Sequence, residues 1–147
     1  MNKIRITLAD DDEDDQYFFS QALTDSGIGA QLTTLTDGNQ LIDHLLNLNE
    51  APVPDIIFLD LNMPGMDGKS CLREIRRHEN LFPIPIIILS TSSRLKDITD
   101  TYDAGANKYI AKMLFYSGSV TCLRRLFAGN WRKRLSHPSL KTFCEID

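Results

Sequence analysis

Residues 55–68 read DIIFLDLNMPGMDG, and this stretch decides the fold of the 147-residue chain. The run 56–59 is apolar and is bounded by aspartates, which is typical of a short buried strand and predicts one over 55–60. Met63-Pro64-Gly65 then favours a turn, and a helix is expected from about 67 to 79. The stretch therefore predicts a strand, a loop and a helix, with Asp60 at the end of the strand.

The same order of strand and helix is repeated along the chain. Expected strands cover 4–9, 31–36, 55–60, 86–89 and 108–111. Expected helices cover about 12–26, a segment after Asp37-Gly38, 67–79, 95–104 and about 120–134. Strict alternation with short connections predicts parallel strands joined by crossover helices. The predicted fold class is therefore α/β, with a doubly wound sheet that helices cover on both faces.

The composition favours one folded domain. Apolar residues make up 42% of the chain, which is enough for a hydrophobic core and excludes a disordered or fibrous protein. We expect this domain over 1–135, followed by a polar tail over 136–147. No apolar run approaches the roughly 20 residues that span a bilayer, and no secretory signal is visible. Cys71, Cys122 and Cys144 form no CxxC pair, so a cytoplasmic location is expected.

Charge is distributed unevenly along the sequence. Residues 1–68 hold 13 acids and 2 bases, whereas residues 69–147 hold 7 acids and 14 bases. Within the acidic run 10–15, we interpret 12–15 as carboxylates at a helix start that face solvent, where the helix dipole favours negative charge. We interpret the basic residues within 124–134 as a solvated last helix, because they match no nucleic-acid reading motif. A nucleic-acid partner is therefore not favoured, and no membrane partner is expected.

Charged and hydroxyl residues gather at the carboxyl ends of the expected strands. The residues that end four different strands are Asp10-Asp11, Asp60, Ser90 and Lys112. In an open parallel sheet, ligands and reactions collect just beyond this edge. We therefore expect three acids, one hydroxyl and one ammonium group to meet in a single site.

Such a cluster requires positive charge. Two carboxylates about 4 Å apart repel each other by roughly 4 kcal/mol at an effective dielectric constant of about 20. Lys112 supplies one positive charge, and Mg²⁺, which prefers oxygen ligands, is the ion that fits best. Zinc is a poor candidate because no His or Cys stands at ligand spacing nearby. A carboxylate beside Mg²⁺ and an ammonium group can attack phosphorus and form an aspartyl phosphate.

Four motifs together resemble the receiver domain of two-component response regulators. They are the acid pair Asp10-Asp11, the sequence Asp60-x-x-Met-Pro-Gly-x-Asp-Gly, the strand-end Ser90, and Gly105-Ala-x-x-Tyr-x-x-Lys112. The likeness covers residues 3 to about 112 in order. It implies a flavodoxin-like, five-stranded parallel sheet in the order 2-1-3-4-5 with five helices. It also implies a stand-alone response regulator of a histidine-to-aspartate phosphorelay.

The resemblance implies roles for the acids and the lysine. Asp60 would accept the phosphoryl group, and Lys112 would contact it. Asp10, Asp11 and Asp60 would bind Mg²⁺ together with the backbone carbonyl of Asn62. A sensor histidine kinase or a histidine phosphotransfer protein would donate the phosphoryl group. The chain would catalyse only its own phosphorylation and dephosphorylation, so it is not expected to be an enzyme acting on other substrates.

The resemblance also implies a switch. Ser90 would move toward the phosphoryl group, and Tyr109 would turn inward into the space that Ser90 leaves. This change would repack the face made by the fourth helix, the fifth strand and the fifth helix, where a downstream protein or a second copy of the chain would bind. Asn62 and Ser92 would tune the lifetime of the phosphorylated state.

The chain departs from the family's pattern in three places. Met113 stands where Pro usually follows the lysine, often after a cis bond. A cis bond before a non-proline residue costs about 2.5–4 kcal/mol, so a trans bond or a local distortion is expected here. The connection 47–54 is longer than usual, and the segment 113–120 lacks the customary acidic helix start.

Two alternatives compete with a phosphoacceptor regulator. One is a Mg²⁺-dependent aspartyl-phosphate phosphatase for small molecules, a class that usually carries Asp-x-Asp on its first strand and a cap over the site. The acids at the end of the first strand are adjacent here, and the chain has no room for a cap. The other alternative is a module that binds partners without phosphorylation, against which the set Asp11, Asp60, Ser90 and Lys112 argues.

Overall fold

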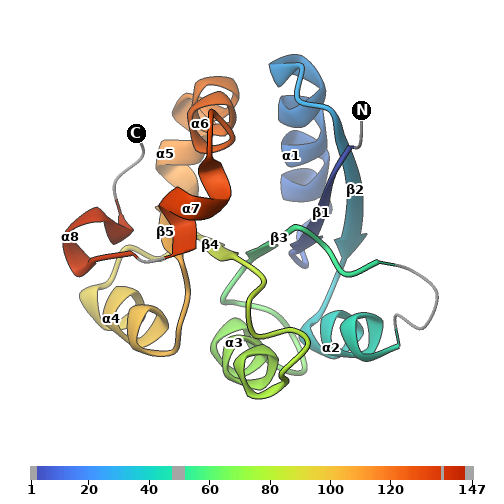
Figure 1. The fold of residues 1–147 in the computed structure, drawn as a ribbon, viewed down its shortest axis with the longest axis vertical. Coiled ribbons are helices and arrows are strands. Elements are labelled where there is room, and N and C mark those ends of the chain that lie inside the picture. Colours follow the sequence, from blue (N-terminus) through green and yellow to red (C-terminus); the bar gives the residue numbers. More distant parts are fainter. Residues whose placement is uncertain (1–2, 48–51, 137, 145–147) are drawn as a thin grey trace.

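The computed structural model describes residues 3–47, 52–136 and 138–144 (Figure 1). Its centre is a five-stranded sheet in the order β2-β1-β3-β4-β5, which confirms the predicted order. The strands are β1 (Ile4–Ala9), β2 (Ala30–Leu35), β3 (Ile56–Leu59), β4 (Ile86–Ser90) and β5 (Lys108–Ala111). All four pairings are parallel, so the carboxyl ends of the strands lie at the same edge of the sheet.

Helices cover both faces of the sheet. They are α1 (Glu13–Ser26), α2 (Gly38–Leu46), α3 (Gly68–Arg77), α4 (Leu95–Asp103), α5 (Lys112–Ser117), α6 (Ser119–Leu126), α7 (Trp131–Ser136) and α8 (Leu140–Phe143). Figure 1 shows α1, α5, α6 and α7 on one side, with α2, α3 and α4 on the other. Within the described part of the chain, no helix is long and apolar enough to cross a membrane.

The central strands supply two hydrophobic cores because successive side chains point to opposite faces of a sheet. Ile57 and Leu59 of β3 belong to the core that includes Leu72 of α3. Ile56 and Phe58 belong to the opposite core, which α1 and α6 complete. Burial of both faces explains why 56–59 is apolar without alternation.

A glycine brings the start of α3 against the end of β3. A Cβ atom on Gly68 would lie 2.3 Å from the carbonyl oxygen of Asp60 and 2.6 Å from the Cα of Leu61. The backbone N–H of Gly68 donates to the carbonyl of Leu61 at 2.9 Å. Asp67 caps the helix by accepting the backbone N–H of Ser70 at 2.8 Å. This close approach, which only glycine permits, fixes the loop that follows Asp60.

The prediction of one last helix at about 120–134 was wrong. A helix begins directly after β5 at Lys112, and the helical region is divided at Gly118 and Gly129 into α5, α6 and α7. The guanidinium of Arg134 donates to the carbonyl oxygens of Leu126 and Ala128, which lie at and beyond the end of α6. Since a helix end leaves its last carbonyls without partners, this arginine stabilises the break between α6 and α7.

The segment beyond 135 is not simply a polar tail. Residues 140–143 form α8, and Phe143 is fully buried with its ring centroid 5.2 Å from that of Tyr102 and 6.3 Å from that of Tyr109. Residues 137 and 145–147 of the expected tail lie outside the described residues, as do residues 48–51 of the long connection before β3. A single buried aromatic anchors α8, and one such residue leaves no periodic pattern in the sequence.

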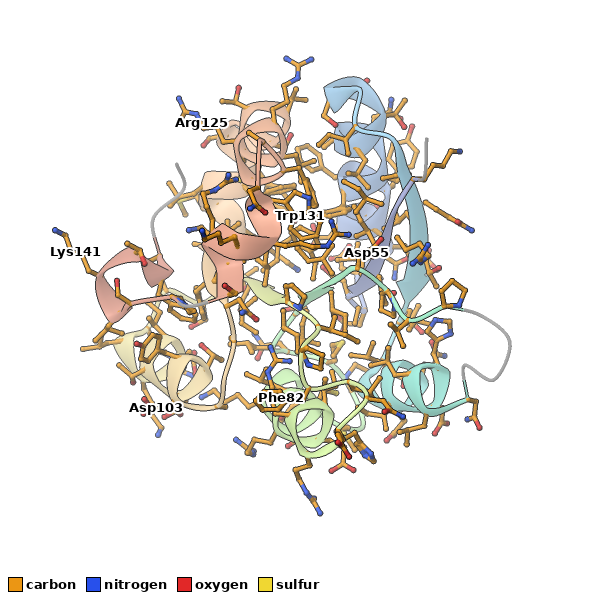
Figure 2. All side chains as sticks on the ribbon, viewed as in Figure 1. Asp55, Phe82, Asp103, Arg125, Trp131 and Lys141 are labelled. Atoms are coloured by element: carbon orange, nitrogen blue, oxygen red, sulfur yellow. The ribbon has the colours of Figure 1, made fainter. Side chains whose placement is uncertain are left out.

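Several basic residues of the last helices make contacts within the chain. Arg124 donates to the carbonyl oxygen of Ser26, at the end of α1, at 3.1 Å. Arg132 forms an ion pair with Asp55 at 3.1 Å and lies 4.4 Å from the centroid of the Trp131 ring. Trp131 itself is buried, as expected for a residue that packs the last helices against the sheet. Figure 2 shows Trp131 and Asp55 on neighbouring segments near the middle of the molecule.

We predict that Phe143→Ala destabilises the protein because it leaves a cavity between α8, α4 and β5. The free energy of unfolding should fall by about 3 kcal/mol, as is usual for a buried Phe. Leu140→Ala is the matched control on the same helix, since Leu140 is 55% exposed. Urea unfolding of the two variants measures the difference. Equal stabilities would show that α8 does not contribute to the core.

Candidate phosphoryl and metal site

The structure brings the predicted residues together at the carboxyl edge of the sheet. Asp10 follows β1, Asp60 follows β3, Ser90 ends β4, and Lys112 follows β5. All four side chains are buried, with exposed fractions between 0% for Ser90 and 5% for Asp60. Asp11 is exposed beside them. Four buried side chains therefore line the bottom of the site, and the carboxylate of Asp11 is exposed to solvent.

Lys112 is the centre of the cluster. Its Nζ lies 2.8 Å from a carboxylate oxygen of Asp10, 3.1 Å from one of Asp60 and 2.7 Å from one of Asp15. An ammonium group has three N–H donors, so these three carboxylates can use all of them. The remaining oxygen of Asp60 accepts the backbone N–H of Asn62 at 3.3 Å.

The electrostatics reveal a shortage of positive charge. Burial raises the pKa of Asp60 to about 6, with Lys112 opposing the shift and Asp10 adding to it. Burial also raises the pKa of Asp10 above its ordinary value, and Lys112 again opposes. Burial alone would lower the pKa of Lys112, but hydrogen bonds to Asp10 and Asp15 raise it above its ordinary value. One ammonium group therefore does not fully offset the carboxylates around it.

The donor set fits a hard divalent cation. Asp10, Asp11 and Asp60 each offer a carboxylate oxygen, and these oxygens lie within 4.8 Å of one another. Magnesium prefers oxygen ligands and binds through one or two carboxylates with several waters. A cation here would also supply the positive charge that the raised pKa values of Asp10 and Asp60 indicate is needed.

The loop after β4 connects the site to Tyr109. The Ser90 Oγ accepts the backbone N–H of Ser92 at 3.2 Å. The Tyr109 hydroxyl donates to the backbone carbonyl of Ser92 at 2.9 Å. Tyr109 is only 2% exposed, so its ring points into the protein in this structure. Burial raises the pKa of the Tyr109 phenol, which keeps the hydroxyl a donor.

A charged network that the sequence analysis missed holds the same loop from the other side. The Ser92 Oγ donates to Asp97 at 2.5 Å, and Lys69 of α3 lies 2.7 Å from the other carboxylate oxygen of Asp97. Lys69 and Ser92 hold the pKa of Asp97 below its ordinary value. No sequence signal links residues 69, 92 and 97, because three separate elements bring them together.

The interpretation of 12–15 as solvent-facing acids needs correction at Asp15. Asp12 does cap α1, accepting the backbone N–H groups of Asp14 and Asp15. The Asp15 carboxylate, however, accepts hydrogen bonds from Lys112 and from the hydroxyl of Tyr116. Lys112 and Tyr116 are four residues apart, which places them on one helix face. That spacing would have indicated a shared acceptor for Lys112 and Tyr116 if a helix had been predicted from residue 112, but it does not identify Asp15 as that acceptor.

The expected trans peptide bond before Met113 is confirmed, because none of the described peptide bonds is cis. Lys112 is the first residue of α5, and the Met113 side chain is 81% exposed. The chain therefore turns from β5 into a helix without the Pro of the family's pattern, and Lys112 still reaches Asp60.

Fold and site together define a doubly wound α/β domain with an acidic pocket at the carboxyl edge of its sheet. The family model for the response regulator receiver domain matches residues 6–116. The chain therefore belongs to the response regulator receiver domain family of two-component signalling proteins.

Similar proteins support this family assignment. Response regulator Rcp1 of Synechocystis sp. is 34% identical over 110 residues, covering 73% of this chain and 75% of Rcp1. The DNA-binding transcriptional regulator NtrC of Klebsiella pneumoniae is 33% identical over 118 residues, covering 80% of this chain. Only 24% of NtrC is matched, so this likeness concerns one part of a longer protein.

Solved structures share the fold. The phosphorylated cyanobacterial phytochrome response regulator RcpA is 32% identical with a TM-score of 0.77, covering 86% of this chain and 94% of RcpA. The Mn²⁺-bound form of Rcp1 is 29% identical with a TM-score of 0.75, covering 92% of this chain and 99% of Rcp1. Two similar proteins are thus described as phosphorylated and as bound to a divalent cation.

We predict that the contribution of Asp60 to the free energy of unfolding decreases as the pH rises. Its pKa is about 6 in the folded chain and about 3.9 in an unfolded one, so the unfolded state ionises first. The contribution of this carboxyl to the free energy of unfolding should be highest below about pH 4, fall up to about pH 6 and stay low above. In metal-free buffer, Asp60→Asn should therefore gain stability over the wild type as the pH rises across this range.

Urea unfolding at several pH values measures this gain. Asp14→Asn is the control for loss of one negative charge, because Asp14 is exposed on the first turn of α1. A stability difference between wild type and Asp60→Asn that does not change with pH would contradict the prediction.

Proposed function

We propose that this chain is a phosphoacceptor response regulator of a histidine-to-aspartate phosphorelay, with Asp60 as the residue that is phosphorylated. The observation that carries the proposal is the contact of 3.1 Å between Lys112 Nζ and an oxygen of Asp60, inside a group of carboxylates suited to a divalent cation. The arrangement combines a nucleophile, a fixed positive charge and oxygen ligands for Mg²⁺.

The reaction would proceed by attack of an Asp60 oxygen on the phosphorus of a phosphohistidine. The bond between phosphorus and the histidine nitrogen breaks, and its electron pair stays on that nitrogen. Lys112 would contact the transferred group, and the Ser90 hydroxyl would donate to one of its oxygens. Mg²⁺ held by Asp10, Asp11, Asp60 and the backbone carbonyl of Asn62 would neutralise part of the charge on that group.

The switch would act through the loop after β4. When Ser90 Oγ turns toward the phosphoryl group, its hydrogen bond with the Ser92 N–H is lost, and the loop can shift. Tyr109 already lies inward in this structure, where its hydroxyl donates to the Ser92 carbonyl, so the switch would not need to turn this ring inward as the family pattern implies. A shift of the loop would instead move the hydrogen-bond partner of an inward Tyr109. A local change of charge would thereby bias a surface with two conformations.

Asn62 and Ser92 are proposed to tune how fast water removes the phosphoryl group. Asn62 is exposed at the mouth of the site, two residues after Asp60. Ser92 is held by Asp97, so its hydroxyl is not free to approach the site while that bond persists. The chain would catalyse only its own phosphorylation and dephosphorylation.

The output surface is proposed to include α4, β5 and α5. Helix α8 packs on β5, and its Phe143 contacts both Tyr102 of α4 and Tyr109 of β5, so α8 forms part of this surface. A downstream protein or a second copy of the chain would bind there. The phosphoryl donor would be a sensor histidine kinase or a histidine phosphotransfer protein, and the chain would act in the cytoplasm. Since RcpA is described as a phytochrome response regulator, a phytochrome kinase is a rational first donor to test.

We expect incubation with Mg²⁺ and acetyl phosphate to add one phosphoryl group to the wild type. Intact mass measures the addition, and the adduct should be stable in acid and labile in base, as an acyl phosphate is. Asp60→Asn should acquire none, because it lacks the nucleophile. Absence of the adduct in the wild type, or equal labelling of both proteins, would refute the proposal. Turnover of many equivalents of a small phosphate ester would instead favour the phosphatase alternative.

A further inference from the structure

Asp15 is a third carboxylate on Lys112 that neither phosphoryl acceptance nor cation binding uses. Its oxygen lies 2.7 Å from Lys112 Nζ, the shortest of the three contacts of this ammonium group. The side chain of Asp15 is 21% exposed, whereas that of Lys112 is 4% exposed. The contact therefore lies at the rim of the pocket and holds a lysine whose own atoms are buried.

Backbone and side-chain contacts fix Asp15 itself. The carboxylate of Asp12 accepts the backbone N–H of Asp15 at 3.1 Å, which fixes the first turn of α1. The second carboxylate oxygen of Asp15 accepts a hydrogen bond from the Tyr116 hydroxyl. Both Asp15 oxygens are thus engaged, one by Lys112 and the other by Tyr116. Burial acts to raise the pKa of the Asp15 carboxyl, but the hydrogen bonds from Lys112 and Tyr116 outweigh this effect and keep the pKa below its ordinary value.

An aromatic contact supports the same junction between α1 and α5. The Phe18 ring lies 4.8 Å from the Tyr116 ring, centroid to centroid, in an edge-to-face arrangement. Helix α5 has no side-chain cap at its start. The hydrogen bonds to Asp15 and the packing of Phe18 therefore add to the support of this helix by buried Phe115, whose ring stacks on Phe19 of α1 with centroids 5.6 Å apart.

The physical consequence concerns the direction of the lysine. A lysine side chain has four carbons and much rotational freedom, and its ammonium group can point to several acceptors. With Asp15 holding one N–H, the other two are directed at Asp10 and Asp60. Without Asp15, one N–H of the ammonium group would lose its acceptor, and the group could shift between Asp10, Asp60 and water. Small errors in the position of a reacting group have large effects on rates, so this restraint matters for phosphoryl transfer.

We propose that Asp15 is a positioning residue for phosphoryl transfer, which aims Lys112 at the phosphoryl group on Asp60 and is itself held by Tyr116. The proposal rests on the proposed function, since it concerns the same reaction. Asp15 acts through Lys112 and makes no contact with the transferred group.

The test compares Asp15→Asn with Asp14→Asn in acetyl phosphate labelling at saturating Mg²⁺, followed by intact mass. Both variants lose one negative charge from the first turn of α1, but Asp14 is exposed and caps nothing with its side chain. Asp15→Asn should label about tenfold more slowly at saturating acetyl phosphate, and Asp14→Asn within about twofold of the wild type. Asp15→Asn labelling as fast as the wild type would overturn the proposal.

Two further variants separate positioning from general structural damage. Asp15→Glu keeps the carboxylate and should label faster than Asp15→Asn. Tyr116→Phe keeps Asp15 but removes the hydroxyl, and it should slow labelling by about threefold, because Asp15 then loses one of its two partners. Equal rates for Asp15→Glu and Asp15→Asn would overturn the proposal, since the charge on residue 15 would then have no role.

A readout without phosphorylation or metal completes the test. In the metal-free wild type, the hydrogens on Lys112 Nζ should exchange slowly with water, because the ammonium group is buried and bonded to three carboxylates. The group should therefore give an observable nitrogen NMR signal. Asp15→Asn should lose this signal, while Asp14→Asn keeps it; an unchanged signal in Asp15→Asn would overturn the proposal. If the wild type itself does not label, the proposed function fails, whereas wild-type labelling with an unaffected Asp15→Asn defeats this inference alone.

Discussion

The ammonium group of Lys112 stands among carboxylates from three elements, and the carboxyl edge of the sheet depends on it. Buried carboxylates repel each other and lose their hydration, so Asp10 and Asp60 can remain in one pocket only if positive charge lies within hydrogen-bonding distance. Lys112 provides that charge at 2.8 Å and 3.1 Å from their oxygens. The raised pKa values of both acids indicate that the compensation is incomplete. An unmet demand of this kind makes the pocket suited to a divalent cation bound by Asp10, Asp11 and Asp60.

The parallel sheet is the device that makes this arrangement possible. Strands β1, β3 and β5 are separate in sequence, but parallel pairing aligns their carboxyl ends. Close packing at Gly68 then fixes the loop after β3, while α1 and α5 hold Lys112 through Asp15. The loop after β4 is held differently, by hydrogen bonds of Ser92 to Ser90, Tyr109 and Asp97. These restraints are polar hydrogen bonds, and in the proposed switch this loop is the segment that would move while the core stays fixed.

Much of the fold and the inner site followed from local patterns. Apolar runs and their alternation with helical spacing predicted the five strands, and the rule for strand ends identified Asp10, Asp60, Ser90 and Lys112. The roles of Asn62 and Ser92 remain predictions from the family resemblance. The failures had one origin. Asp15 and the network around Asp97 depend on contacts between elements far apart in sequence, and the division of the last helix depends on how Arg134 and Trp131 pack.

Sequence alone determined the period of each element, the class of the fold and which chemical groups stand at strand ends, because these depend on neighbours within a few residues. Only the tertiary structure decided that Asp15 binds Lys112 at the solvent side of the site, that Asp97 accepts the Ser92 hydroxyl, and that Phe143 anchors α8. Charge-assisted hydrogen bonds and aromatic packing are set by distances of a few ångströms between elements. Those distances arise from the packing of the whole core, so no local pattern in the chain records them.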